Sequence, residues 1–297
     1  MKLLVLGGSG QVGQAFLTEA ERRGSAALGT FATHPHPGLV AWDGSVPDAR
    51  ALIAGFQPTL VVYASAWTAV DACEADPERA TVINAETPVA VARALPPSAR
   101  LVFLSTEYVF DGTSGPYGED DPVNPLSAYG RTKRAAEVGI LEARPDALII
   151  RTTVVFGPDP QNKNFVAQLF RNLSAGNGMR VPRDQVSSPT YAPDLAAAAL
   201  GLAHISADGI WHVAGPRIVD RYQFAVEAAD VLALPAALLE PVATADLKQP
   251  ALRPLQAGLR INRLQQALGP SVMRDPMDAV REYGRLLRSN AAGPGAC

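Results

Sequence analysis

The sequence predicts an α/β protein built on a doubly wound parallel sheet, with a smaller α/β domain in the C-terminal part of the chain. Two observations support this prediction. A short apolar run at the N-terminus ends in closely spaced glycines, and patterns typical of buried strands then alternate with helical patterns. The chain has 297 residues, of which 47% are hydrophobic and 19% charged, so it is long enough to bury such a core.

Glycines join the first predicted strand to the first predicted helix. Leu3–Leu6 are apolar, the glycines follow with the spacing Gly7-x-x-Gly10-x-x-Gly13, and apolar residues at helical spacing run from Gln11 to Arg23. Glycine tolerates the positive φ of a tight turn and lets a pyrophosphate approach the backbone at a helix N-terminus. We therefore expect a Rossmann-type dinucleotide-binding turn. A glycine-rich turn without a ligand is the alternative.

The segment after the second predicted strand bears on the choice of cofactor. An NAD-binding unit usually has an acidic residue after this strand, which we expect over Ala26–Thr30, to hold the ribose hydroxyls. No acidic residue occurs between Glu21 and Asp43, and the sequence has Thr33 and His34 instead. Because no carboxylate would repel a 2′-phosphate there, we expect NADP, with NAD as the alternative.

Two side chains near this strand have two interpretations each. His34 is either a ligand of the cofactor phosphate or a solvated loop residue. Asp43 follows a short predicted strand over Leu39–Asp43, and it either accepts a hydrogen bond from the adenine amino group or caps the turn that follows.

Three further apolar runs complete the predicted sheet. They span Leu60–Ala64, Leu101–Thr106 and Leu148–Ile150, with helical patterns at Ala49–Phe56 and Asp76–Ala94. Ligands of open α/β sheets bind at the carboxyl ends of the strands, so we expect the site at the ends of these runs.

A tyrosine and a lysine four residues apart follow the strand that ends at Thr106. Tyr129 and Lys133 lie in a segment that is predicted to be helical from about Ser127, so they share one helix face. A cation beside a phenol lowers the tyrosine pKa, which suits a group that exchanges protons near neutral pH. The Thr106 hydroxyl is a candidate ligand of a substrate carbonyl. A surface tyrosine with a neighbouring lysine is the alternative interpretation of the pair.

Charge and cysteine usage narrow the remaining classes of function. The net charge of −3 argues against nucleic acid as a main partner. Cys73 and Cys297 lie far apart and form no disulfide framework, so we expect a cytoplasmic protein. The first apolar run is too short for a signal peptide, and no apolar stretch approaches the roughly 18 residues of a membrane span. No cluster has metal-ligand spacing, so no metal site is expected.

The chain resembles the extended short-chain dehydrogenase/reductases, and among them most closely the dTDP-4-dehydrorhamnose reductase family. The resemblance extends from residue 1 to about residue 268. The matching residues are Gly7–Gly13, Ala66–Asp71, Glu74, Asn84, Ala85, Ser105–Gly112, Tyr117, Glu119, Pro125, Leu126, Tyr129–Lys133, Glu137, Arg151, Thr152, Asn164, Phe165, Asp184, Gln185, Pro189, Thr190, Arg253 and Pro254.

The resemblance implies an NAD(P)-dependent oxidoreductase that reduces the 4-keto group of a 4-keto-6-deoxy nucleotide sugar, as in dTDP-rhamnose biosynthesis. Tyr129 would be the general acid, Lys133 would bind the nicotinamide ribose and lower the tyrosine pKa, and Thr106 would bind the carbonyl. Glu107 joins them as a candidate acid/base. The expected cofactor ligands are Gly7, Gly10, Gln11, Val12, Gly13, Thr33, His34, Asp43, Ala64, Ser65, Ala66, Ser105, Tyr129, Lys133 and Thr152.

The expected substrate ligands lie mainly in the C-terminal half, because a sugar diphosphate needs cations and neutral donors. They are Trp67, Asn164, Arg183, Gln185 and Arg253, with Lys163 and Arg217 as further cationic candidates and a solvated surface position as the alternative for each cation. His212, on an apolar strand, is expected to be structural. The chain departs from the family at Glu107, where the family usually has Asp, and at Val154, where it often has Trp near the sugar. Trp67 is also larger than the usual residue, and ordinary core packing is its alternative role.

The expected domains are a dinucleotide-binding domain over 1–155, to which 190–232 returns, and a substrate domain over 156–189 and 233–297. The expected partner is a small nucleotide sugar, and the expected assembly is a homodimer. Two alternative functions stay open. One is an epimerase or dehydratase of the same superfamily, with Glu107 as its added acid/base. The other is a non-catalytic regulator that resembles the beta subunit of methionine adenosyltransferase. The presence of Thr106, Tyr129 and Lys133 together favours the reductase.

Overall fold

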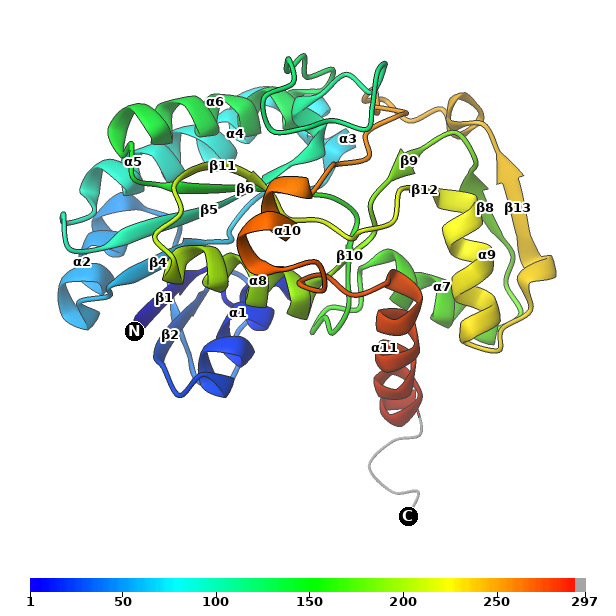
Figure 1. Cartoon of the computed structure of the whole chain (residues 1–297), viewed down its shortest axis with the longest axis horizontal. Helices are drawn as coiled ribbons and strands as arrows, with labels where there is room; N and C mark the ends of the chain where they lie inside the picture. The colour runs from blue at the N-terminus through cyan, green and yellow to red at the C-terminus, as the bar shows by residue number, and fades with distance from the viewer. Residues whose placement is uncertain (292–297) are drawn as a thin grey trace.

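Seven parallel strands form the central sheet of the structure, a computed structural model that describes residues 1–291 (Figure 1). They are β1 (Lys2–Leu6), β2 (Ala26–Phe31), β3 (Leu39–Ala41), β4 (Leu60–Tyr63), β5 (Arg100–Thr106), β6 (Leu148–Thr152) and β11 (Gly209–His212). Their order is β11-β6-β5-β4-β1-β2-β3, which reverses between β1 and β4. The prediction of a doubly wound sheet is therefore confirmed. Cys297 lies outside the described residues.

The first strand is buried on both faces of the sheet. Leu3 and Val5 pack into one hydrophobic cluster, and Leu4 and Leu6 pack into another on the opposite face. Successive side chains of a strand point to opposite faces, so an unbroken apolar run is what a strand covered on both sides requires.

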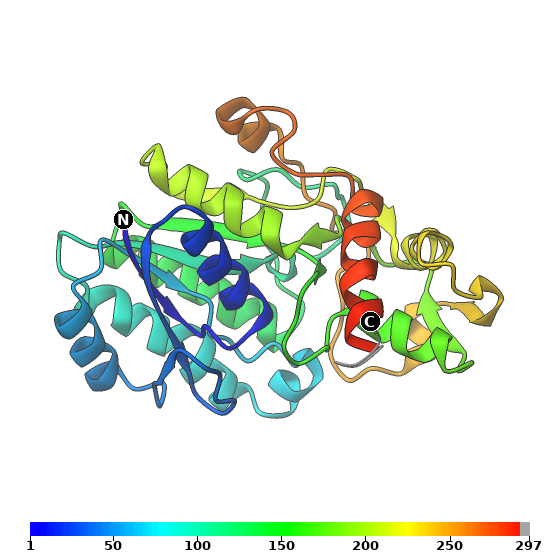
Figure 2. The same cartoon turned by 90° about the horizontal axis from the view of Figure 1, so that it is seen from below.

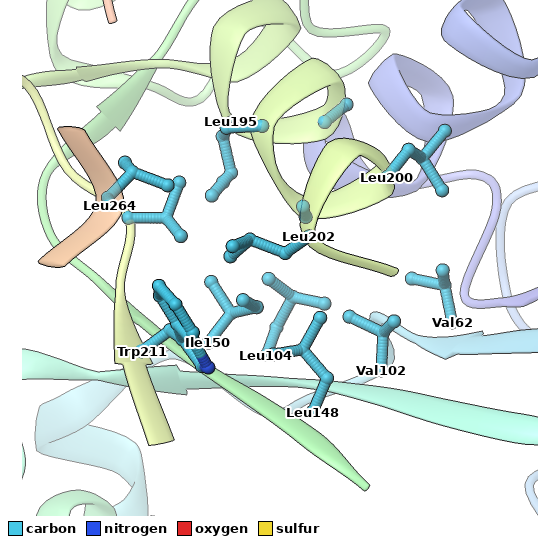
Figure 3. Close-up of a cluster of buried hydrophobic side chains, with 14 of the residues drawn as sticks. Val62, Val102, Leu104, Leu148, Ile150, Leu195, Leu200, Leu202, Trp211 and Leu264 are labelled. Carbon is cyan, nitrogen blue, oxygen red and sulfur yellow. The ribbon is translucent and has the colours of Figure 1, made fainter. Parts of the chain in front are cut away.

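Helices cover the two faces of the sheet. The helices α1 (Gln11–Arg22) and α8 (Ala192–His204) lie side by side on one face (Figure 2). The opposite face is covered by α2 (Val46–Phe56), α5 (Thr87–Ala94) and α6 (Ala128–Ala143). Figure 3 shows the core beneath α8, where Leu195 and Leu202 lie over strand residues such as Ile150.

A smaller unit with its own core lies beside the carboxyl ends of the strands. Its elements are α7 (Phe165–Ser174), β8 (Met179–Pro182), α9 (Arg221–Val231), β13 (Leu239–Val242) and α11 (Pro276–Ala291), with the short helices η3 (Ala236–Leu238) and η4 (Thr244–Leu247). Three two-stranded sheets pair β13 with β8, β10 (Thr190–Tyr191) with β7 (Val155–Phe156), and β12 (Val219–Asp220) with β9 (Val186–Ser187).

The segment 190–232, expected to return to the first domain, is divided between the two cores. The elements α8 and β11 pack with the central sheet, whereas α9 packs in the smaller unit because it buries Phe224, Ala225 and Ala228 there. The helix α10 (Asn262–Leu268) was expected in the substrate domain, but it packs against α8 and β11 beside the central sheet. The domain boundaries stay a prediction.

The helix predicted over Asp76–Ala94 contains a π-helical turn. The structure has α4 (Pro77–Thr81), the π-helix η1 (Val82–Glu86) and α5 in direct succession, after the short helix α3 (Val70–Ala75). π-Helical turns are frequent at functional sites, and η1 carries Asn84, which is buried. None of the helices that the structure describes is long and apolar enough to cross a membrane.

Candidate active site

A cleft of about 1010 Å³ opens at the carboxyl ends of the central strands, lined by residues of both the sheet and the smaller unit. Most of the residues that the sequence suggested for the site line it. They are Gly7, Gly10, Gln11, Val12, Gly13, Thr33, His34, Ala64, Ser65, Ala66, Trp67, Ser105, Thr106, Glu107, Tyr129, Lys133, Thr152, Asn164 and Gln185. Asp43, Arg183 and Arg253 are not among the lining residues.

The glycine turn has the shape that a dinucleotide pyrophosphate needs. Gly7 has a φ of +93°, and a Cβ there would lie 2.6 Å from the backbone nitrogen of Ser65. A Cβ on Gly13 would collide with the Gly7 carbonyl oxygen, whereas one on Gly10 would meet only that oxygen, at 3.6 Å. Gly7 and Gly13 are therefore needed for packing, and Gly10 leaves open space. No side chain caps the first turn of α1, so its N–H groups are available to an anion.

The end of β2 carries no carboxylate that faces the cleft. Thr33 and His34 line it, with Thr33 Oγ1 2.7 Å from His34 Nδ1. The carboxylate of Asp43 accepts a hydrogen bond from the Ser45 backbone N–H at 2.7 Å, which is the turn role named above. Of the described residues that line the cleft, only Glu107 and Asp159 are acidic, and neither lies on the segment after β2. No carboxylate that the structure describes at the cofactor end of the cleft would therefore repel a 2′-phosphate.

The catalytic candidates lie on β5, on the short helix η2 (Glu107–Val109) that follows it, and on α6. Thr106 ends β5, and its hydroxyl accepts a hydrogen bond from the Tyr108 N–H at 3.2 Å and lies 2.8 Å from Glu107 Oε2. Ser127 caps α6 by accepting a hydrogen bond from the Gly130 N–H at 3.2 Å. The helix thereby starts where Tyr129 falls on its first turn and faces the cleft.

Tyr129 and Lys133 are both buried, and burial governs their protonation. Burial is the largest influence on the pKa of Tyr129 and raises it, and the Thr106 hydroxyl lowers it. Burial lowers the pKa of Lys133 to about 7, and its Nζ lies 3.9 Å above the ring of Phe103. The expectation that Lys133 brings the tyrosine pKa toward neutrality is therefore wrong for the chain alone, since desolvation dominates. Tyr129 stays a phenol, which is the form that donates a proton.

An ion-pair network behind the cleft fixes the ends of β5 and β6. The carboxylate of Glu137, fully buried, accepts hydrogen bonds from Arg151 Nη2 at 2.8 Å and from Ser105 Oγ at 2.6 Å. Next to it, the buried hydroxyls of Thr152 and Thr153 line the cleft and have no hydrogen-bond partner among the described residues. The Thr153 hydroxyl faces Glu107, whereas the Thr152 hydroxyl is free to bind a ligand, and a nicotinamide nucleotide presents suitable groups.

The suggested substrate residues divide into two groups. Asn164 caps α7 and donates to the Gly157 carbonyl oxygen at 3.0 Å, so its amide has a structural role. Arg253 forms a two-point ion pair with Asp71, and Arg183 is exposed outside the cleft. Gln185 lines the cleft and binds Arg221. The other two cationic candidates also differ, because Lys163 lines the cleft whereas Arg217 pairs with Glu227.

Arg221, the first residue of α9, is a cleft residue that no pattern in the sequence indicated. Its guanidinium lines the cleft and donates a hydrogen bond to Gln185 Oε1 at 3.1 Å. It also lies 5.1 Å from the ring centre of Phe165. No Asp or Glu among residues 1–291 forms an ion pair with it. A sheltered cation without a counter-ion is suited to an anionic ligand. No local motif marked this arginine, because the fold brings it to the cleft from a distant segment.

Trp67 is held at the cleft by Asn84. The Asn84 side chain accepts a hydrogen bond from the Trp67 N–H at 2.8 Å and donates one to the Trp67 carbonyl oxygen at 3.0 Å. The guanidinium of Arg79 lies 4.8 Å from the ring centre of Trp67. The π-helical turn aims Asn84 at this loop, so the tryptophan is fixed at the wall of the cleft. Cys73 is buried next to them with a free thiol.

Comparison with known proteins agrees with this geometry. A family model described as the RmlD substrate binding domain matches residues 1–283. The dTDP-4-dehydrorhamnose reductase of Streptomyces griseus is 36% identical over 299 residues, which cover 98% of this chain and 95% of that protein. The crystal structure of dTDP-4-dehydrorhamnose reductase from Bacillus anthracis in complex with NADP has a TM-score of 0.86 and 25% identity, and it covers 95% of this chain and 98% of that one. Methionine adenosyltransferase 2 subunit beta of Danio rerio is 31% identical, covering 95% of this chain and 89% of that protein.

Proposed function

This chain belongs to the family of the RmlD substrate binding domain, and from that membership we propose that it is an NADPH-dependent reductase of a dTDP-linked 4-keto-6-deoxy sugar. It is an oxidoreductase of the extended short-chain dehydrogenase/reductases. The observation that supports the reaction best is that Thr106, Tyr129 and Lys133 line one cleft with the glycine turn.

The groups in the cleft suit the reduction of a carbonyl. Bound NADPH supplies a hydride to the carbonyl carbon. Tyr129 stays protonated because burial raises its pKa, and it donates that proton to the developing alkoxide. Thr106 binds the carbonyl oxygen through its hydroxyl. Lys133 would hold the hydroxyls of the nicotinamide ribose.

The cofactor-binding residues follow from the same geometry. The free N–H groups at the start of α1 would hold the pyrophosphate over Gly10. Thr33 and His34, at the end of β2, would meet the 2′-phosphate. The unpartnered hydroxyl of Thr152 would bind at the nicotinamide end.

The sugar nucleotide would lie on the side of the smaller unit. Arg221 and Lys163 are the cations of that side and would bind the diphosphate, with Gln185 holding Arg221 in place. Trp67 would form the wall beside the sugar. We propose that the protein acts in the cytoplasm as a homodimer on this small-molecule substrate. The buried free thiol of Cys73 is in keeping with a reducing compartment.

A direct assay tests this function. The purified protein is mixed with NADPH and a dTDP-4-keto-6-deoxy sugar, and NADPH absorbance is followed while the product is identified by NMR. We expect one NADPH to be oxidised for each 4-hydroxy sugar formed. An epimerase or dehydratase would change the sugar without net NADPH oxidation, and a regulatory subunit would show no turnover at all.

Replacing the general acid provides the control within the same assay. Tyr129→Phe should lower turnover by about 100-fold to 10,000-fold while NADPH still binds, because only the proton donor is lost. Tyr222→Phe, at a position outside the cleft lining, should turn over as the unaltered protein does. Undiminished turnover in the Tyr129 variant would exclude the proposed acid.

A further inference from the structure

Glu107 is a buried acid inside the cleft, and the side chains next to its carboxyl group are the hydroxyls of Thr106 and Thr153. It is 6% exposed, and its Oε2 lies 2.8 Å from Thr106 Oγ1. Among residues 1–291, no lysine, arginine or histidine lies within ion-pair distance of it. A carboxylate in such a place has lost water and gained no cation in contact, so its charged form is disfavoured.

The hydroxyl of Thr106 has one proton and two lone pairs. The Tyr108 N–H occupies one lone pair, Glu107 Oε2 lies 2.8 Å from the hydroxyl oxygen, and the Tyr129 hydroxyl faces it from the cleft side. If Glu107 is ionised, it can only accept, so the single Thr106 proton points to it and none remains for a substrate. If Glu107 is protonated, its O–H occupies the second lone pair, and the Thr106 proton is free to point into the cleft.

The surroundings of Glu107 favour the protonated form. Burial is the largest influence on its pKa and raises it, while the hydroxyls of Thr106 and Thr153 and the charge of Arg221 lower it. The ionisable groups that face Glu107 are Arg221 at the start of α9, Tyr108 on η2 and Tyr129 on α6. Burial raises the pKa of both tyrosines, so they stay neutral. Among these groups only Arg221 carries a charge that favours the ionised carboxylate of Glu107. Its guanidinium also donates a hydrogen bond to Gln185.

We propose that Glu107 acts as a neutral carboxylic acid that donates its proton to Thr106 Oγ1 in a hydrogen bond and so directs the Thr106 proton to the carbonyl oxygen of the substrate. Glu107 is then a positioning residue that works through Thr106. The proposal rests on the proposed ketoreductase function. It also explains why Glu107 can stand where the family usually has the shorter Asp, since the carboxyl group has only to reach the Thr106 hydroxyl.

A comparison of two variants tests this role through the pH profile of kcat/KM. In Glu107→Gln the side-chain amide keeps an N–H donor for Thr106 at every pH, so turnover at neutral pH should stay within a few-fold of the unaltered protein. In Glu107→Leu the donor is lost, and turnover should fall by about 10-fold to 100-fold. Rising pH ionises Glu107 in the unaltered protein, which should lose activity on the alkaline side, whereas Glu107→Gln should lack that decline. Equal losses in both variants at every pH would overturn the proposal.

A second measurement reads the protonation state without turnover. Protein labelled with ¹³C at the glutamate carboxyl carbons is titrated by NMR, and the Glu107 signal is identified by its absence in Glu107→Gln. We expect this signal to keep the shift of a carboxylic acid at neutral pH. An ionised Glu107 at neutral pH would contradict the proposal. A protein that turns over no sugar but shows a protonated Glu107 would contradict the proposed function instead.

Discussion

Burial, rather than the neighbouring lysine, sets the charge of Tyr129, the proposed general acid, in the chain alone. The spacing of Tyr129 and Lys133 correctly places both on one helix face, and both line the cleft. The spacing does not reveal that both side chains are desolvated, which raises the pKa of the tyrosine and lowers that of the lysine to about 7. For a reductase this favours the protonated phenol, which is the reactive form of a general acid.

The cations proposed for the substrate site were the hardest residues to predict. Arg253 lies in a motif of the family, yet its guanidinium is occupied by Asp71. Arg221 lies in no motif, and tertiary packing alone brings it to the cleft beside Gln185. A single sequence shows which residues are charged, but only the fold shows which charges are already paired.

A pair of arginine variants checks this assignment. Arg221→Met should raise the KM for the nucleotide sugar by about 10-fold to 100-fold, because a charge-assisted hydrogen bond to the diphosphate is lost. NADPH affinity, measured by fluorescence, should not change. Arg183→Met removes an exposed cation outside the cleft and should leave both quantities unaltered. If Arg183→Met raised the KM and Arg221→Met did not, Arg183 and not Arg221 would be the cation that binds the diphosphate.

At the scale of elements, the glycine turn was the most predictable feature. Its spacing, together with the flanking strand and helix, defines a backbone geometry that other residues cannot adopt. Helix interiors were less predictable. The pattern over Asp76–Ala94 indicates one helix, whereas the structure has a π-helical turn at its centre. Asn84 on this turn forms hydrogen bonds with the distant Trp67, and no local pattern records such a contact.

Substitutions at two glycines of this turn should have different effects, one on cofactor affinity and the other on the stability of the fold. In Gly10→Ala the new methyl group has space, so the free energy of unfolding should change by less than about 1 kcal/mol, while NADPH affinity falls about tenfold or more. In Gly13→Ala the methyl group collides with the Gly7 carbonyl oxygen, so unfolding should become easier by about 1–3 kcal/mol.

Thermal unfolding and NADPH fluorescence titrations give both quantities. Gly55→Ala, on α2 with nothing near the added methyl group, is the matched control and should bind NADPH normally. If Gly10→Ala also bound NADPH normally, the pyrophosphate would not lie over this glycine.

At the scale of the whole molecule, three contacts connect the two units around the cleft. Arg253 pairs with Asp71 on α3, and Arg274 pairs with Asp194 on α8. Gln11 on α1 donates to the Gly157 carbonyl oxygen at 3.1 Å. The residues of the cofactor side and of the substrate side are therefore held in one arrangement by contacts between distant segments.

We expect the ion pair of Asp71 with Arg253 to hold the two units together and not to bind the substrate. Asp71→Asn and Arg253→Met should raise the KM for the sugar nucleotide to a similar extent, and the double variant should be no worse than either. The pair should show a coupling of about 1 kcal/mol in the free energy of unfolding. If Arg253 bound the diphosphate directly, its variant would raise the KM while Asp71→Asn would not.

The destination of the hydride tests the central claim most directly. The protein is incubated with NADPH that carries deuterium at the transferable position of the nicotinamide and with a dTDP-4-keto-6-deoxy sugar, and the product is analysed by NMR and mass spectrometry. We predict one deuterium per product molecule, bound at sugar C4 beside a new hydroxyl group, with one NADPH consumed. A converted sugar without deuterium at C4, or no conversion by a protein that binds NADPH, would contradict the assignment as a 4-ketoreductase.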